Sequence, residues 1–406
     1  MEVKQIYEIL NSIKKESLGE TAVINEDLSN VVEIGTTILS TMGVDNYVRS
    51  LVNHIGRVIF VNRTYKGKAP NVLMDGWEYG SILEKIDCDM PDSVANDSWN
   101  LRDGTSYDQD TFHAPKNVRA KFFNGKVTFE VEMSYTEMQV KESFSNATQL
   151  NAFFSMIDTK IRNRFTLDYR NLIMRTINNF SAATIYNEFS DKLNTETHKY
   201  TFGNLSGVRA INLLGKYKTQ IAPTSELTAE TCLSDLDFLK FAAREMMLVS
   251  DRLSDMSTLF NIGKRERFTP KEKQHFVLLS EFAKSADIYL QSVTFHEEFT
   301  KLPDAETVVY WQGTGTDYNF NSTSTIHIST NKLFNKSNVA AESPVEMIIP
   351  GVIGCIFDHD ALGVNNKDNR SPSHYNAKGE FVNFFYKSDA QYFNDYDENF
   401  VVFFVA

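Results

Sequence analysis

The chain has 406 residues, of which 42% are hydrophobic and 23% charged, an ordinary globular composition that allows two or three folding units of about 150 residues each. Its formal net charge of -12 disfavours binding to nucleic acid by counterion release, which needs clustered Lys and Arg. Cys88, Cys232 and Cys355 lie far apart with no CxxC pair, so neither a disulfide framework nor a zinc module is indicated, and we expect synthesis in a reducing interior.

The N-terminal sequence MEVKQIYEILNSIKKES lacks the continuous apolar segment of a secretory signal. No later segment approaches the roughly 18 apolar residues that a membrane-spanning helix needs. We therefore expect a protein that is soluble when made and has no membrane partner.

Two short amphipathic helices are predicted near the N-terminus. Apolar residues recur at helical spacing within residues 2–15 and again within residues 32–39. Either helix could pack on a neighbouring subunit or on its own domain, and the pattern does not distinguish between the two.

A long hairpin is predicted next. Trp77 to Asp89 has the pattern of a strand, and Val118 to Thr136 contains alternating Val and Phe after a predicted turn at Asn124 and Gly125. Between them, Met90 to Asn117 is rich in Asp, Asn and Ser and has few aliphatic residues to form a core. So long a projection is uncommon in a compact domain unless it contacts a partner.

The strongest helical pattern follows the hairpin. Apolar residues recur every three or four positions from about Thr148 to Phe189, with no internal Gly or Pro, and Ser145 and Asn146 could cap the first turn. This length is typical of a structural spine whose apolar stripe packs partly on a sheet.

The next region contains one helix and one ambiguous segment. Ser234 to Phe260 has helical periodicity, and the basic stretch Lys264 to Lys273 is interpreted as a solvated connection because Glu residues dilute its charge. Thr269 to Glu272 fits a capping box with Pro at the first helical position, yet His275 to Leu279 is equally compatible with a buried strand.

The C-terminal third is predicted to be rich in strands. Short apolar or aromatic runs alternate there with polar turns, and the aromatic side chains are interpreted as core rather than as a cofactor site. The predicted strands are Thr307–Trp311, Thr325–Ser329, Val345–Ile349, Gly351–Phe357, Glu380–Tyr386 and Phe400–Val405.

No motif for catalysis, cofactor binding or metal binding is found. There is no P-loop and no GxSxG, and Gly313 to Gly315 is a lone GxG. His296 is followed by two Glu residues but lacks the second His of HExxH, and Asp358 to Asp360 with His374 is interpreted as a hydrated loop. We predict no catalytic, cofactor-binding or metal-binding residue, although a pair of catalytic carboxylates cannot be identified from sequence.

Three sequence stretches carry a family resemblance. Residues 31–60 (VVEIGTTILSTMGVDNYVRSLVNHIGRVIF), Asp75–Ile86 and Asn151–Ile157 resemble major capsid proteins of small, short-tailed phi-29-like phages. The predicted order of N-terminal helices, projecting hairpin, spine helix and aromatic strands is similar to the Hong Kong 97-type capsid fold. The resemblance implies an α+β chain of this fold.

The resemblance also implies a domain organisation. Residues 1–57 would form the N-arm, 58–136 the region with the extended E-loop, and 137–204 the P-domain with the spine helix. Residues 205–395 would form most of the A-domain, and residues 396–406 a final strand that returns to the P-domain.

By the same resemblance, the protein is expected to be a major capsid protein that self-assembles into the icosahedral shell around a tailed phage's double-stranded DNA. The implied partners are further copies in pentamers and hexamers, a scaffolding protein, a portal, and DNA enclosed without sequence-specific binding. The chain would be made in the host bacterial cytoplasm and reside in the virion. The residues expected to contact a neighbouring subunit, at the E-loop tip, are Asp92, Trp99, Leu101, Arg102 and Tyr107.

Three other interpretations remain open from the residues. One is another virion component, such as a portal or tail protein, although a portal would contain more helix. Another is a virion-associated polysaccharide hydrolase, and the last is a binding module with an aromatic platform for carbohydrate. Uniform closed shells of the expressed protein would distinguish the capsid interpretation from the other three.

Overall fold

The computed structural model describes residues 69–72, 82–93, 103, 114–136, 147–293, 305–312, 323–331, 333–379 and 381–406. The chain forms two compact units. One comprises Met1–Lys66, Glu130–Thr166 and Arg370–Lys387, and the other comprises Gly67–Phe129, Leu167–Asn369 and Ser388–Ala406. The helices predicted within residues 2–15 and 32–39, and the predicted caps Ser145 and Asn146, lie outside the described residues.

A single helix, α5 (Ala147–Phe189), confirms the predicted spine. It continues without interruption because its sequence has no Gly or Pro and supplies apolar residues at each turn. Its C-terminal part is deeply buried, with Ile177, Phe180 and Ile185 fully enclosed. A single 3₁₀ turn, η3 (Ser190–Lys192), ends it.

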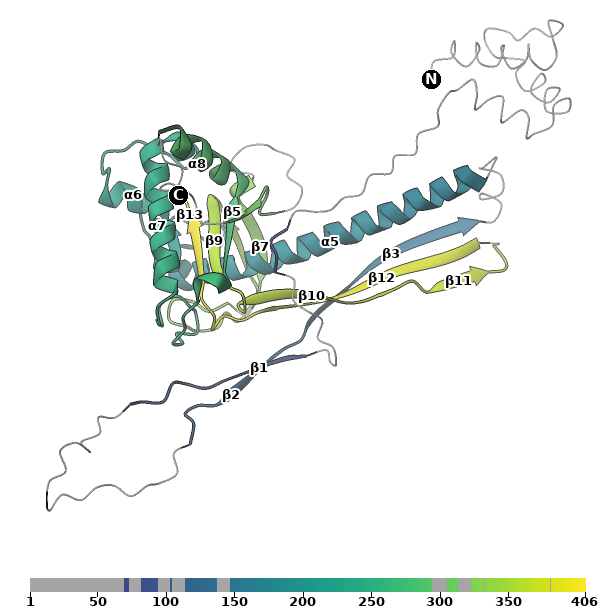
Figure 1. Cartoon of the computed structure of the whole chain (residues 1–406), viewed down its shortest axis with the longest axis horizontal. Helices are drawn as coiled ribbons and strands as arrows, with labels where there is room; N and C mark the ends of the chain where they lie inside the picture. Colours follow the sequence, from purple (N-terminus) through teal and green to yellow (C-terminus); the bar gives the residue numbers. More distant parts are fainter. Residues whose placement is uncertain are drawn as a thin grey trace, which may run out of the picture. The chain divides into compact units, whose positions relative to one another are not determined.

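The core of the larger unit is a five-stranded sheet in the order β4-β13-β9-β5-β6 (Figure 1). Its strands come from widely separated parts of the chain, and only the outer pairs, β4 with β13 and β5 with β6, are parallel. The strands are β4 (Ala210–Asn212), β5 (Gln274–Leu279), β6 (Glu306–Val308), β9 (Val352–Asp358) and β13 (Phe400–Phe404).

Both faces of this sheet are covered, which explains why its central strands are almost continuously apolar. On β13, Phe400, Val402 and Phe404 pack with α5, whereas Val401 and Phe403 pack with the helices of the opposite face. Those helices are α6 (Leu213–Gln220), α7 (Leu236–Leu253) and α8 (Ser280–Val293), and the 3₁₀ turn η4 (Cys232–Ser234) precedes α7.

A second sheet is organised around the 14-residue strand β12 (Phe381–Asn394), which pairs with three other strands. The predicted strand Glu380–Tyr386 covers only its first half. Two of the partners were not predicted, because their sequences LGVNNKDNR and SHYN are polar. The partners are β3 (Gly125–Thr136), β10 (Leu362–Arg370) and β11 (Ser373–Asn376).

The predicted projecting hairpin is present as β1 (Leu83–Asp87) paired antiparallel with β2 (Arg119–Phe123). The turn predicted at Asn124 and Gly125 is wrong, because β3 leaves β2 there and pairs with β12 instead of folding back. Gly125 is needed for another reason. A Cβ at this position would lie 2.5 Å from the carbonyl oxygen of Tyr392.

The predicted helix Ser234–Phe260 is shorter in the structure. α7 begins after Asp235, whose carboxylate accepts a hydrogen bond from the Phe238 N–H, and ends at Leu253. Of the two interpretations of the segment after Thr269, the strand is confirmed. The local helix signal yields only one 3₁₀ turn, η5 (Lys271–Lys273), before β5 begins.

The remaining strands, β7 (Ile326–Thr330) and β8 (Val345–Ile349), form a two-stranded antiparallel sheet where strands were predicted. Within the described part of the chain, no helix is long and apolar enough to cross a membrane.

Candidate functional site

The two faces of the β1–β2 hairpin differ sharply in chemistry. Side chains alternate along a strand, and along both strands half-buried residues alternate with exposed ones. The half-buried face carries Leu83, Lys85, Asp87, Arg119, Lys121 and Phe123. This charged face points toward the rest of its compact unit. The opposite face of the hairpin points away from it.

Two lysines on the charged face would repel each other without a counterion. Lys85 and Lys121 are directly opposite in the strand register, and one carboxylate lies between them. The two oxygens of Asp395 lie 3.0 Å from Lys85 Nζ and 2.9 Å from Lys121 Nζ. Since the Asp395 side chain is only 5% exposed, this contact is an anchor for the hairpin rather than a solvated surface pair.

Asp395 begins an acidic turn between β12 and β13 that also contains Asp397 and Glu398. Burial by itself would raise the pKa of the Asp395 carboxyl, but Lys85 and Lys121 outweigh burial and hold the pKa below its usual value. The pKa of Glu398 is raised, because burial and the nearby carboxylates Asp395 and Asp358 together outweigh the lowering effect of Lys85 and Arg267. The turn thus holds one firmly ionised carboxylate and one that burial destabilises in its charged form.

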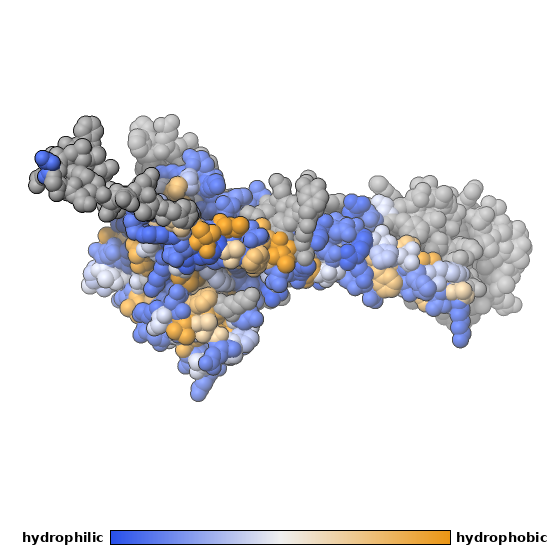
Figure 2. Space-filling model, turned by 90° about the horizontal axis from the view of Figure 1, so that it is seen from below, coloured by the Kyte–Doolittle hydropathy of each residue, from blue (hydrophilic) through white to orange (hydrophobic). Residues whose placement is uncertain are grey.

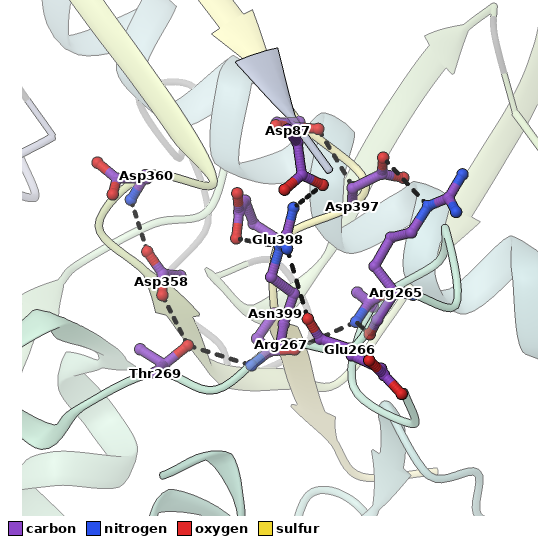
Figure 3. A network of polar contacts seen from close by, with 12 residues as sticks. Asp87, Arg265, Glu266, Arg267, Thr269, Asp358, Asp360, Asp397, Glu398 and Asn399 are labelled. Atoms are coloured by element: carbon purple, nitrogen blue, oxygen red, sulfur yellow. Dashed lines mark hydrogen bonds and ion pairs between the residues drawn. The ribbon is translucent and has the colours of Figure 1, made fainter. Parts of the chain in front are cut away.

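Arg265 and Arg267 connect the hairpin to the acidic turn (Figure 3). Arg267 Nη2 lies 2.6 Å from Asp87 of β1, and its Nε lies 3.4 Å from Glu398. Arg265 lies 3.7 Å from both Asp89 and Asp397. The interpretation of this basic stretch as a solvated connection is therefore wrong for these two residues, which hold two parts of the fold together.

A third group of polar contacts is centred on Asp358. Asp358 accepts a hydrogen bond from Thr269 Oγ1 at 2.7 Å and another from the Asp360 N–H at 2.8 Å (Figure 3). Because Asp358 is only 6% exposed, the predicted hydrated loop is wrong for this residue. A pocket of about 360 Å³ lies among these groups and is lined mainly by charges of both signs, including Lys85, Arg267 and Asp358.

The outer face of the hairpin is open to solvent and carries large apolar side chains beside Glu84. Ile86 is 68% exposed and Phe122 is 64% exposed, and Ile82 and Val118, which directly precede β1 and β2, are also exposed. Figure 2 shows apolar residues in orange at the surface among hydrophilic ones in blue. Large apolar side chains that stay exposed on one face of a monomer make that face a candidate for contact with another chain.

The residues predicted to contact a neighbouring subunit fall mostly outside the described part of the chain. Of the five, only Asp92 is described, and it is exposed and forms an ion pair with Lys116. Trp99, Leu101, Arg102 and Tyr107 lie outside the described residues. Among described residues, no group of three or more His, Cys, Asp or Glu side chains is arranged to hold a metal ion.

Sequence reasoning missed the charged face of the hairpin and the acidic turn. A usable signal was present, since Leu83, Lys85 and Asp87 alternate with Ile82, Glu84 and Ile86 as a two-faced strand requires. The acidic run at Asp395 to Glu398 was a second signal. Neither shows by itself that the two segments meet.

Comparison with known proteins identifies one family. A model of the Phi29-like phage major capsid protein family matches residues 10–404 of the chain. No curated protein matches the chain significantly.

Solved structures of phage particles resemble the fold. A structure of the head fibre and inner core protein gp22 of native bacteriophage P68 is 9% identical, with a TM-score of 0.52, 86% of this chain covered and 88% of that one. The capsid structure of Staphylococcus phage Andhra is 8% identical, with a TM-score of 0.44. The match covers 87% of this chain and 89% of that one. The capsid structure of the cyanophage P-SCSP1u is 10% identical, with a TM-score of 0.45. The match covers 88% of this chain and 94% of that one.

Proposed function

The chain belongs to the Phi29-like phage major capsid protein family, and from this membership we propose that it builds the phage shell through the two-faced β1–β2 hairpin. The prediction of a major capsid protein, made from the sequence, is confirmed by the family match over residues 10–404. So is the α+β fold of the Hong Kong 97-like capsid proteins. The portal or tail, hydrolase and glycan-binding interpretations are not those of this family.

The observation that carries the proposal is the pairing of an anchored face with an open apolar face. Ion pairs through Lys85, Lys121 and Arg267 hold the hairpin on its own subunit. The opposite face presents Ile86 and Phe122 to solvent, which gives an isolated monomer no stabilisation. Covering such a face with a second copy would remove this apolar area from water.

The geometry of shells explains why the hairpin suits this role. A closed shell repeats heterologous contacts, in which one surface of a subunit meets a different surface of the next. A projecting ribbon with a free apolar face can lie on a neighbour while its own root stays fixed. We assign the hairpin and residues 88–118 to the E-loop, and Asp92, Trp99, Leu101, Arg102 and Tyr107 to its contact with the neighbour.

The domain assignment that we propose follows the sequence boundaries. Residues 1–57 are the N-arm, 58–136 include the E-loop, 137–204 the P-domain and 205–395 most of the A-domain. Residues 396–406 return to the spine helix, and the packing of Phe400 against Phe180 of α5, with ring centroids 4.2 Å apart, supports this last assignment.

Partners beyond further copies of the chain also belong to the proposal. We infer a scaffolding protein and a portal that guide assembly, DNA enclosed without sequence-specific binding, synthesis in the host cytoplasm and no catalytic activity. The net charge of -12 supports a container that does not grip its genome, because strong phosphate contacts would hinder packing and release.

Electron microscopy of purified protein, alone or with its scaffolding protein, tests the proposal. The expected result is uniform closed particles. Deleting Pro91 to Asp110 should abolish closure, while circular dichroism and thermal unfolding show that the deleted subunit still folds. Normal shells built by the deletion variant would contradict the E-loop assignment.

A further inference from the structure

A column of stacked rings crosses the central sheet and ends in a pair of histidines. Phe400 on β13 stacks on Phe357 of β9 with centroids 5.6 Å apart, and Phe357 stacks on His275 of β5 at 5.5 Å. His275 then stacks on His359 at 5.1 Å. The register places Phe357 directly opposite both Phe400 and His275, so the column follows from strand pairing.

The two imidazoles also share a hydrogen bond. His275 Nε2 lies 2.9 Å from His359 Nδ1, so one of these nitrogens must carry a hydrogen and the other must accept it. The bond survives when the pair is neutral and when it holds one extra proton. With both rings protonated, both nitrogens are donors, the bond is lost, and two positive charges face each other.

The position of His359 links this bond to the hairpin. His359 lies in the short segment between β9 and β10, and its N–H donates to the Lys273 carbonyl oxygen at 2.9 Å. The next residue, Asp360, accepts a hydrogen bond from Lys85 Nζ through its carbonyl oxygen at 2.7 Å. Ala361 accepts another from the Asp395 N–H at 2.7 Å. A displacement of His359 would therefore disturb both the hairpin lysine and the acidic turn that holds it.

The groups around the histidine pair shift the pKa of His275 in opposite directions. Burial and the proximity of His359 lower the pKa of His275, whereas Glu306 on β6 and Asp358 on β9 act to raise it. On the side of His359, Asp360 pairs with Lys273 of η5 at 3.7 Å. The pKa of His275 lies below its usual value of 6.5. The stability that the neutral ring contributes is therefore fully present above pH 6.5 and is lost as the pH falls below 6.5.

We propose that the His275–His359 pair is an acid-sensitive latch, which releases the β1–β2 hairpin from the acidic turn when both imidazoles are protonated. The inference concerns the hairpin's attachment to its own subunit. It can therefore fail while shells still assemble, and it can hold in a subunit that does not assemble.

Hydrogen exchange of the full-length, unassembled subunit tests the latch. Amide exchange of peptides spanning residues 82–123, corrected for intrinsic rates, would be compared at about pH 7.5 and about pH 5, on either side of the ordinary histidine pKa. The double variant His275→Gln and His359→Asn replaces the two imidazoles with amides, which can donate and accept hydrogen bonds but do not titrate. His327→Gln is the matched control, because His327 pairs with Glu346 on the β7–β8 sheet instead.

A several-fold rise in exchange at acidic pH is expected in the wild type and in His327→Gln, and its absence is expected in the double variant. Equal rises in all three proteins, or no rise in the wild type, would overturn the proposal. If the double variant does not fold, His359→Asn alone serves, because an Asn side-chain oxygen can accept a hydrogen bond from His275 and only one ring can then titrate. If hydrogen exchange then rises as much in His359→Asn as in the wild type, the proposal is overturned.

Discussion

At the scale of single residues, the hairpin depends on charges that neutralise one another across long stretches of sequence. Asp395 is shared by two facing lysines, and Lys85 also lies 5.7 Å from the centre of the Phe393 ring. Arg267 connects β1 to the acidic turn through Asp87 and Glu398. Such partly buried ion pairs are costly to break, because removal of one partner leaves the other desolvated and unpaired.

Arg267→Ala is therefore expected to lower the free energy of unfolding of the subunit by about 1–3 kcal/mol, the usual cost of losing hydrogen bonds to charged groups. Urea unfolding at neutral pH measures the loss. Arg162→Ala is the matched control, since Arg162 forms an exposed pair with Asp158 within α5, and its removal should cost less than about 0.5 kcal/mol. Equal costs for the two variants would show that the ion pairs of Arg267 with Asp87 and Glu398 contribute nothing beyond a surface pair.

At the scale of elements, side chains along β1 and β2 alternate between the face that anchors the hairpin and the face proposed to contact another subunit. The adjacent residues Phe122 and Phe123 lie on different faces. Phe123 lies 5.3 Å from the ring of Phe393 on β12, whereas Phe122 lies on the exposed face. One ribbon can therefore be fixed to its own subunit and still present apolar area to a neighbour.

Phe122→Ser is expected to leave the unfolding free energy of the subunit within about 0.5 kcal/mol of wild type, because its side chain is already exposed. It should nevertheless reduce the yield of closed shells. Phe123→Ser should cost the subunit about 1–3 kcal/mol, because a packed ring is lost. Chemical denaturation and electron microscopy of both variants measure these effects. Normal shell yield with Phe122→Ser would remove the outer face from the proposed contact.

At the scale of the larger compact unit, the central sheet joins strands that are widely separated in sequence, from β4 at Ala210–Asn212 to β13 at Phe400–Phe404. The last strand, β13, lies between β9 and β4, and its alternate side chains enter the cores on both faces. Phe400 contacts Phe180 of α5 on one side and Phe357 of β9 on the other. The C-terminal residues are therefore needed to complete both cores.

Phe400→Ala is expected to destabilise the subunit by about 3–5 kcal/mol, because the ring is fully buried and its removal leaves a cavity. The shift in the denaturant midpoint measures the loss. Phe400→Leu, which keeps most of the apolar volume, should cost clearly less. If alanine were tolerated as well as leucine, the sheet would not depend on this stack.

The sequence by itself determined the elements whose signal is local and the family to which the chain belongs. α5 follows from apolar spacing without a Gly or Pro, and β8, β9 and β13 follow from short apolar runs between turns. The strings within residues 31–60 carried the resemblance that the family match confirms.

Only the tertiary structure decided which distant segments meet. β10 and β11 are polar, and the second half of β12 extends beyond the predicted strand, so their pairing rather than their composition makes them strands. Lys85 and Asp395 are 310 residues apart in the chain, and periodicity reports only on neighbours along it. Alternation along β1 indicates that the hairpin has two faces, but the contact of one face with the acidic turn and the meeting of His275 with His359 depend on how distant segments pair.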